Sequence, residues 1–135
     1  MIFRDWEEYD LFQPENLITN GNFPDNVDGW NVPWGASISW ENGYAHFSQN
    51  SSYLNAYQDI QVTPGVSYEF SVDITDETIQ GRAFLSDSGG GNSDAVTSAN
   101  KSITFTPQSN SVRVYIGGLD GAGVCMFDNV ILKPA

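Results

Sequence analysis

The sequence predicts an all-β fold, an antiparallel β-sandwich of two sheets that forms a single domain. Turn-forming residues recur at short intervals along the 135 residues, as in Asn42-Gly43, Thr63-Pro64-Gly65 and Gly117-Gly118, and this spacing is typical of sandwiches. Between the turns, apolar and polar residues alternate with a period of two, which indicates strands with one buried face. The length is that of one domain with a two-layer core.

The individual strands follow from this alternation. Residues 36–41 and 44–48 have strand composition, and Asn42-Gly43 between them supplies the positive φ values of a tight hairpin turn. In residues 68–75 one face of the predicted strand is apolar, formed by Tyr68, Phe70, Val72 and Ile74. The same alternation in 103–105 and 112–116 predicts further strands, whose apolar faces meet in the core. Residues 87–100, with three successive glycines, predict a mobile surface loop.

Charge and length exclude several classes of partner. The chain carries 17 acidic and 5 basic residues, a net charge of −12. Nucleic-acid phosphates require Lys and Arg, so we expect no nucleic-acid binding, and an anionic membrane surface is excluded for the same reason. No apolar run approaches the roughly 20 residues that span a bilayer.

The residues that usually carry catalysis are scarce. Cys125 is the one cysteine and lies in an apolar segment, which predicts a buried, unreactive thiol. His46 is the one histidine, and we interpret it as a strand-face residue. Because no Ser/His/Asp arrangement, nucleophile elbow or histidine metal spacing is present, we expect a binding protein and no enzyme.

The first 15 residues form a separate N-terminal arm, ahead of the predicted sandwich of residues 16–135. Acidic residues outnumber the one arginine of the arm, yet aromatic residues recur every three positions, at Phe3, Trp6, Tyr9 and Phe12. Disordered tails seldom carry so many aromatics. We therefore expect the arm to fold back on the sandwich, or to dock onto a virion protein or a second copy of the chain through these aromatics.

Motifs at the two ends of the sandwich carry a resemblance to a known family. Near the start of the sandwich stands the segment Asn16-Leu17-Ile18-Thr19-Asn20-Gly21-Asn22-Phe23, followed by Asp28-Gly29-Trp30. Near its end stands the segment Phe127-Asp128-Asn129-Val130-Ile131-Leu132. This arrangement resembles carbohydrate-binding modules of the family four, nine and twenty-two type. Such modules are galactose-binding-like β-jelly rolls and also occur in phage tail and capsid accessory proteins. The resemblance implies a jelly roll and a non-catalytic binding role.

Sugar binding is the chemistry that the side chains supply best. Pyranose rings present apolar C–H faces that stack on flat aromatic rings, while amide, carboxylate and guanidinium groups bond the hydroxyls. By the resemblance, Trp34 and Trp40 lie where the loops and the first hairpin approach the ligand cleft. Strand parity turns the other candidate ligand-binding residues outward, namely Tyr53, Tyr57, Arg82, Arg113 and Tyr115. For each aromatic the alternative is packing alone.

Arg82 and Arg113 are two of the three arginines in the chain. Two guanidinium groups on one sheet face suit a carboxylate, an anionic sugar or an acidic patch on a partner. The alternative is that they neutralise Glu69 and Asp73 across the sheet.

The resemblance also implies a structural Ca²⁺ where the opening segment meets the closing strand. Calcium takes six to eight oxygen ligands. Asp128 is the carboxylate that matches the family motif. The acidic residue expected directly after the opening Phe23 is replaced by Pro24, and Asp25 follows one place later, which weakens the expected site.

Two functions follow from these observations. The first is a carbohydrate-binding module that targets a glycan for a secreted glycoside hydrolase. The second is a phage virion accessory protein, a capsid decoration or tail component, built on the same fold. We favour the virion role because the chain starts without a signal peptide, has no catalytic partner, and carries an arm suited to docking.

Overall fold

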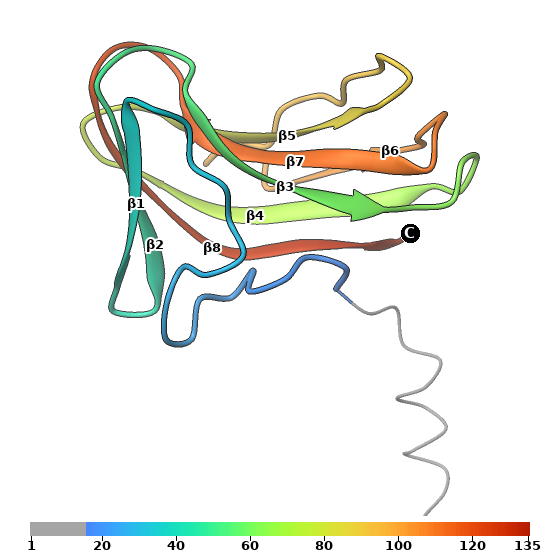
Figure 1. The fold of residues 1–135 in the computed structure, drawn as a ribbon, viewed down its shortest axis with the longest axis horizontal. Helices are drawn as coiled ribbons and strands as arrows, with labels where there is room; N and C mark the ends of the chain where they lie inside the picture. The colour runs from blue at the N-terminus through green and yellow to red at the C-terminus, as the bar shows by residue number, and fades with distance from the viewer. Residues whose placement is uncertain (1–15) are drawn as a thin grey trace, which may run out of the picture.

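The computed structural model describes residues 16–135 and contains two antiparallel sheets, so the predicted β-sandwich is confirmed. The eight strands of these residues are β1 (Ala36–Glu41), β2 (Tyr44–Gln49), β3 (Asn55–Gln61), β4 (Tyr68–Asp76), β5 (Gly81–Asp87), β6 (Ser102–Phe105), β7 (Ser111–Gly118) and β8 (Gly123–Pro134). One sheet has the order β1-β2-β8-β4-β6 and the other the order β3-β7-β5. Figure 1 shows β3, β7 and β5 lying over β4 and β8, with the β1–β2 hairpin at one end.

The predicted hairpin and core faces are confirmed. Asn42 and Gly43 have φ values of 51° and 86°, and the turn joins the paired residues Glu41 and Tyr44, as a tight hairpin requires. The alternating apolar residues of β4 and β7 are buried between the sheets. At the centre, the Phe47 and Phe127 rings meet edge to face with centroids 6.3 Å apart.

The opening segment closes one side of the sandwich. The Asn16 side chain accepts hydrogen bonds from the Ile18 and Leu132 backbone N–H groups and donates one to the Val130 carbonyl. Across the core, the buried Gln58 amide forms two hydrogen bonds with the Thr19 backbone. Residues 16–19 are therefore attached both to β8 and to β3.

The segment after β5 is more ordered than the sequence indicated. Val96 is fully buried, and backbone bridges join Val96 to Ala83 and Asn92 to Ser86. The expectation of a loop confined to the surface is therefore wrong for residues 92–96, which line the edge of β5. Sequence reasoning missed this because two adjacent apolar residues, Ala95 and Val96, after Asn, Ser and Asp give no alternating strand pattern.

Asp87 organises the glycine-rich turn at the end of β5. Its carboxylate accepts hydrogen bonds from the backbone N–H groups of Gly89, Gly91 and Gln108, at 2.9, 3.1 and 3.0 Å. These donors, led by that of Gln108, hold the pKa of the Asp87 carboxyl below its usual range because they favour the charged form.

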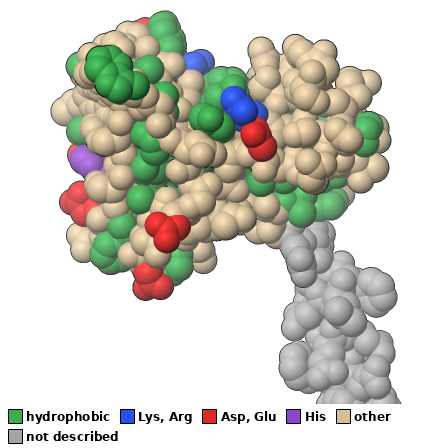
Figure 2. Space-filling model, viewed as in Figure 1, with side chains coloured by type: hydrophobic (Ala, Val, Ile, Leu, Met, Phe, Trp, Pro, Cys, Tyr) green, Lys and Arg blue, Asp and Glu red, His purple; other side chains and the backbone are tan. Residues whose placement is uncertain are grey.

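Two further observations concern the surface and the ends of the described chain. Figure 2 shows acidic side chains scattered singly over the visible face, with few Lys or Arg among them. Across residues 16–135, no helix has the length and apolar character needed to cross a membrane. The arm, with the expected docking residues Phe3, Trp6, Tyr9 and Phe12, lies outside the described residues.

Replacing Asp87 by Asn is expected to lower the melting temperature at pH 7. The amide has one acceptor oxygen and turns a donor toward backbone N–H groups. Because the pKa of Asp87 is lowered in the folded state, its contribution is present above the unfolded pKa of about 3.9 and is lost as the pH falls through the lower folded value.

Thermal unfolding of the wild type and of Asp87→Asn over a pH series measures this difference. The gap between the two melting temperatures should narrow in acid. Asp94→Asn is the matched control, since Asp94 is an exposed aspartate on the segment that follows β5. An equal gap at all pH values would show that the Asp87 charge contributes nothing.

Candidate functional site

The register of the three-stranded sheet determines which side chains face solvent. Tyr57 on β3 pairs with Tyr115 on β7, which pairs with Phe84 on β5. In the row on one side of these three residues, Arg113 pairs with both Asp59 and Ser86. In the row on the other side, Gly117 pairs with both Asn55 and Arg82. Since the residues between them are buried, these three rows form the outer face.

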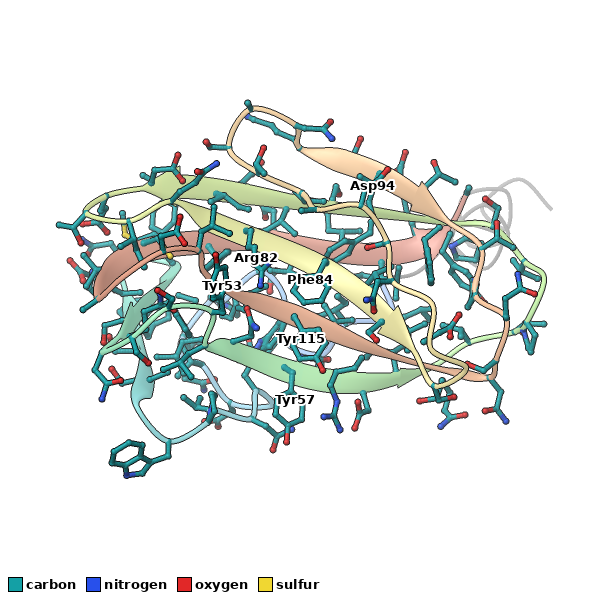
Figure 3. The ribbon with its side chains drawn as sticks, turned by 90° about the horizontal axis from the view of Figure 1, so that it is seen from above. Tyr53, Tyr57, Arg82, Phe84, Asp94 and Tyr115 are labelled. Atoms are coloured by element: carbon teal, nitrogen blue, oxygen red, sulfur yellow. The ribbon has the colours of Figure 1, made fainter. Side chains whose placement is uncertain are left out.

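The central row consists of three aromatic rings, which we call the aromatic platform: Tyr57, Tyr115 and Phe84. The Phe84 and Tyr115 rings are stacked, with centroids 4.7 Å apart and an interplanar angle of 23°. The Tyr57 and Tyr115 rings are 6.2 Å apart and tilted by 54°. Figure 3, which looks onto this sheet, shows the three residues following one another across it. All three side chains are half-buried and so retain surface for a ligand.

Arg113 is neutralised within the sheet. Its Nε donates to Asp59 Oδ1 at 2.8 Å and its Nη2 to Asp59 Oδ2 at 3.1 Å. The guanidinium also lies over the Tyr57 ring, 4.1 Å from the centroid. This bidentate pair lowers the pKa of Asp59 and raises that of Arg113. Arg113 therefore fixes the tilt of Tyr57 and presents a paired, planar polar group beside it.

Arg82 occupies the opposite row, and no carboxylate among residues 16–135 forms an ion pair with it. Its guanidinium carbon is 4.8 Å from the Phe84 centroid and 5.4 Å from the Tyr53 centroid. The Tyr53 hydroxyl donates to Asp120 Oδ1 at 2.8 Å. That hydrogen bond is the main reason why the pKa of Tyr53 is raised. Tyr53 has a φ of 63°, the left-handed conformation that side chains seldom adopt.

The platform has a hollow at one end and a bordering segment on each side. Asp59, Arg113 and Tyr115, with Ser86, Asp87, Ser88 and Ser111, line a polar hollow of about 300 Å³. Asn31 bridges to Tyr57 at the β3 edge, and residues 92–96 follow the β5 edge. The face thus offers apolar rings beside hydroxyl, carboxylate and guanidinium groups, the combination that sugars require.

The structure brings together most of the predicted ligand residues. Tyr53, Tyr57, Arg82, Arg113 and Tyr115 all lie on or beside the outer face of the three-stranded sheet. Trp40 lies on β1 in the other sheet, where its indole N–H donates to the Phe23 carbonyl. Trp34 is 92% exposed, and in the described part of the chain no aromatic pair includes it.

One alternative from the sequence is wrong and one residue was missed. Glu69 and Asp73 belong to β4 in the five-stranded sheet, so they do not neutralise Arg82 or Arg113. Phe84 was not among the predicted ligand-binding residues, although it belongs to the same row as Tyr57 and Tyr115. Phe84 and Arg82 are two positions apart on β5, so their side chains point to the same face of the sheet. The outward position predicted for Arg82 could therefore have identified Phe84.

The expected calcium ligands are separate from this face. Asp128 lies at a bulge of β8, where its carboxylate accepts a hydrogen bond from the Asn129 backbone N–H. Burial raises the pKa of Asp128; the Asn129 hydrogen bond opposes this shift and the Asp73 carboxylate adds to it. Asp25 is exposed. Among residues 16–135, no group of three His, Cys, Asp or Glu side chains is arranged to hold a metal, so a calcium site would depend largely on backbone and amide oxygens.

Comparison by sequence gives no assignment. No family profile matches the chain, and no curated protein matches it.

Comparison of structures finds several similar folds. A structure described as "CBM4 structure and function" has a TM-score of 0.66 and 18% identity, covering 87% of this chain and 99% of that one. The CBM22-1–GH10 modules of xylanase 10B from Clostridium thermocellum give 0.64 and 17%, over 90% of this chain and 29% of that one. Tailspike protein 4 of bacteriophage CBA120 gives 0.64 and 15%, over 89% and 21%.

These similarities are below the identity at which function follows, and they establish the fold. The family resemblance inferred from the two terminal motifs is confirmed at that level. The chain therefore has the jelly-roll fold of carbohydrate-binding modules of the CBM4 and CBM22 kind.

Proposed function

We propose that this protein binds a glycan on the outer face of its three-stranded sheet, without catalysing a reaction. The observation that supports this most is the aromatic platform: three half-buried rings in register on adjacent strands, with the Phe84–Tyr115 pair stacked at 4.7 Å. Because the stacked Phe84 and Tyr115 rings cover one face of each other, the surface that they offer to the C–H groups of a sugar is largely ring edge.

Polar groups at one end of the platform complete the chemistry. The Asp59–Arg113 pair and the serines of the hollow supply acceptors and donors for hydroxyl groups. Because the pair is held by two hydrogen bonds within the sheet, little side-chain freedom is lost when a ligand binds. The CBM22-1–GH10 structure was determined with xylohexaose, which supports a glycan as the partner of this fold.

A second candidate concerns where such binding takes place. The likeness to a phage tailspike supports the virion role, in which the arm attaches this module to a particle; the xylanase likeness supports a secreted module. Glycan binding by the platform is compatible with both. It is therefore the function that we place first, ahead of the virion assignment that the sequence alone favoured.

Replacing Tyr115 or Phe84 by Ala is expected to weaken glycan binding about tenfold or more, which corresponds to about 1.4 kcal/mol. Either change removes one apolar ring of the platform and releases the ring that is stacked on it. After a glycan array identifies a ligand, isothermal titration calorimetry gives the affinity of each variant.

Tyr44→Ala is the matched control, because Tyr44 is a 39% exposed tyrosine on β2 in the other sheet. It should bind as the wild type does. Equal losses for Tyr44→Ala and Tyr115→Ala would show that the platform is not the binding surface. A wild type that binds no glycan on the array would refute the proposed function.

Deletion of residues 1–12 tests the virion candidate. The described contacts of residues 16–19 with β3 and β8 do not involve that segment, so the shortened chain should unfold cooperatively near the wild-type temperature. It should also lose attachment to the particle, or self-association measured by sedimentation. Loss of cooperative unfolding would show instead that the arm belongs to the core.

We also propose that calcium, if bound, acts through Asp128 as a stabilising ion. An ion that binds only the folded state adds about 2.7 kcal/mol at 100 times its Kd. Calorimetry with chelator and then with calcium measures this effect in the wild type, and Asp128→Asn should abolish it. Identical melting curves in chelator and calcium would show that no calcium ion stabilises the folded protein.

A further inference from the structure

Arg82 is a cation held on the platform by aromatic rings. Its guanidinium lies over the Phe84 ring and near the Tyr53 ring, with its carbon 4.8 and 5.4 Å from the two centroids. Figure 3 shows Arg82 beside Tyr53 and Phe84 on the outer face. The cation–π contacts orient the group, and among residues 16–135 its Nε has no hydrogen-bond acceptor.

The described residues do not satisfy Arg82 by charge or by hydrogen bonding. No carboxylate among residues 16–135 forms an ion pair with it, and its Nε is shielded from solvent without a hydrogen-bond partner. Arginine otherwise pairs readily in so acidic a chain, which carries a net charge of −12. Arg113, two rows away on the same face, is bidentately paired with Asp59.

The surroundings of Arg82 favour an acidic ligand group over an internal acid. Gly117 separates Arg82 from Asn55 in their row, and the Asn55 Oδ1 lies over Gly117, so the side chain on this side of Arg82 is a neutral amide and not an acid. The nearby Asp120 accepts the Tyr53 hydroxyl at 2.8 Å and thereby fixes the ring next to the guanidinium. Because Nε is shielded from solvent, an incoming carboxylate would meet the two Nη groups of an oriented, planar guanidinium, which can bond both of its oxygens.

We propose that Arg82 binds the carboxylate of an acidic sugar, so that the glycan recognised by the platform contains uronic acid residues. This inference rests on the proposed glycan binding and specifies its ligand class. The Phe84 ring is stacked on Tyr115 and contacted by Arg82, so a uronic acid would lie along its exposed edge, with the carboxylate beside the Arg82 guanidinium. At the other end of the platform, the Asp59 carboxylate disfavours a second acid, so a neutral sugar or a hydroxyl-rich face belongs there.

Matched pairs of oligosaccharides test the proposal. Titration calorimetry of the full chain would compare oligogalacturonate with galacto-oligosaccharide of the same length, and oligoglucuronate with cello-oligosaccharide. A third pair would be glucuronoxylo-oligosaccharide and xylo-oligosaccharide. In at least one pair, the acidic member should bind about tenfold more tightly or better, and added salt should reduce that advantage.

Variants then separate Arg82 from the rest of the face. Arg82→Gln should lower the affinity for the acidic sugar to that for its neutral counterpart, while Arg82→Lys retains part of the preference. Arg113→Gln is the control and should weaken both members of a pair alike. Melting temperatures of all variants establish that each is folded.

The possible results distinguish this inference from the proposed function. Tighter or equal binding of every neutral member, or an equal loss for acidic and neutral members in Arg82→Gln, would overturn the role of Arg82 and leave glycan binding intact. Failure of the wild type to bind any member of the three pairs or any glycan of a broad array would overturn both.

Discussion

The pairing of β7 with β3 and β5 is the constraint on which both faces of the three-stranded sheet depend. Successive side chains of a strand point to opposite faces, so the register that buries Val114 and Ile116 also turns Arg113 and Tyr115 outward. A slip of one residue would exchange the two sets. The register that is stabilised by burial of the core therefore also fixes the order of the aromatic rings on the outer face.

The edges of this sheet show how the rest of the chain supports that surface. The opening segment reaches β3 through Gln58 and the Asn31–Tyr57 bridge, and residues 92–96 cover the edge of β5. Covered edges leave fewer unpaired backbone groups for association with other strands. The same segments border the platform, so one arrangement protects the sheet and delimits the face on which a glycan would lie.

Local features of the sequence determined what could be predicted. The Asn42-Gly43 hairpin and the buried face of β4 follow from turn chemistry and a period of two, both of which are properties of neighbouring residues. The division of strands between sheets is not local: Arg113 meets Asp59 across 54 positions, while Glu69 lies in the other layer. The alternation of side chains along the strands predicted most of the outer face. It could not show that Arg113 pairs with a carboxylate, whereas Arg82 pairs with none among residues 16–135. Val96 was missed because its burial depends on a single bridged position.

Tyr53 illustrates a conflict between stability and the proposed binding of a glycan. Its left-handed backbone conformation costs a residue with a side chain roughly 1–2 kcal/mol, a cost that glycine would not incur. At this position the protein keeps instead a large ring, 55% exposed, that borders Arg82 and bonds Asp120. A search for thermostable variants would therefore favour glycine or asparagine at position 53. Such a variant would lack the ring that contacts Arg82.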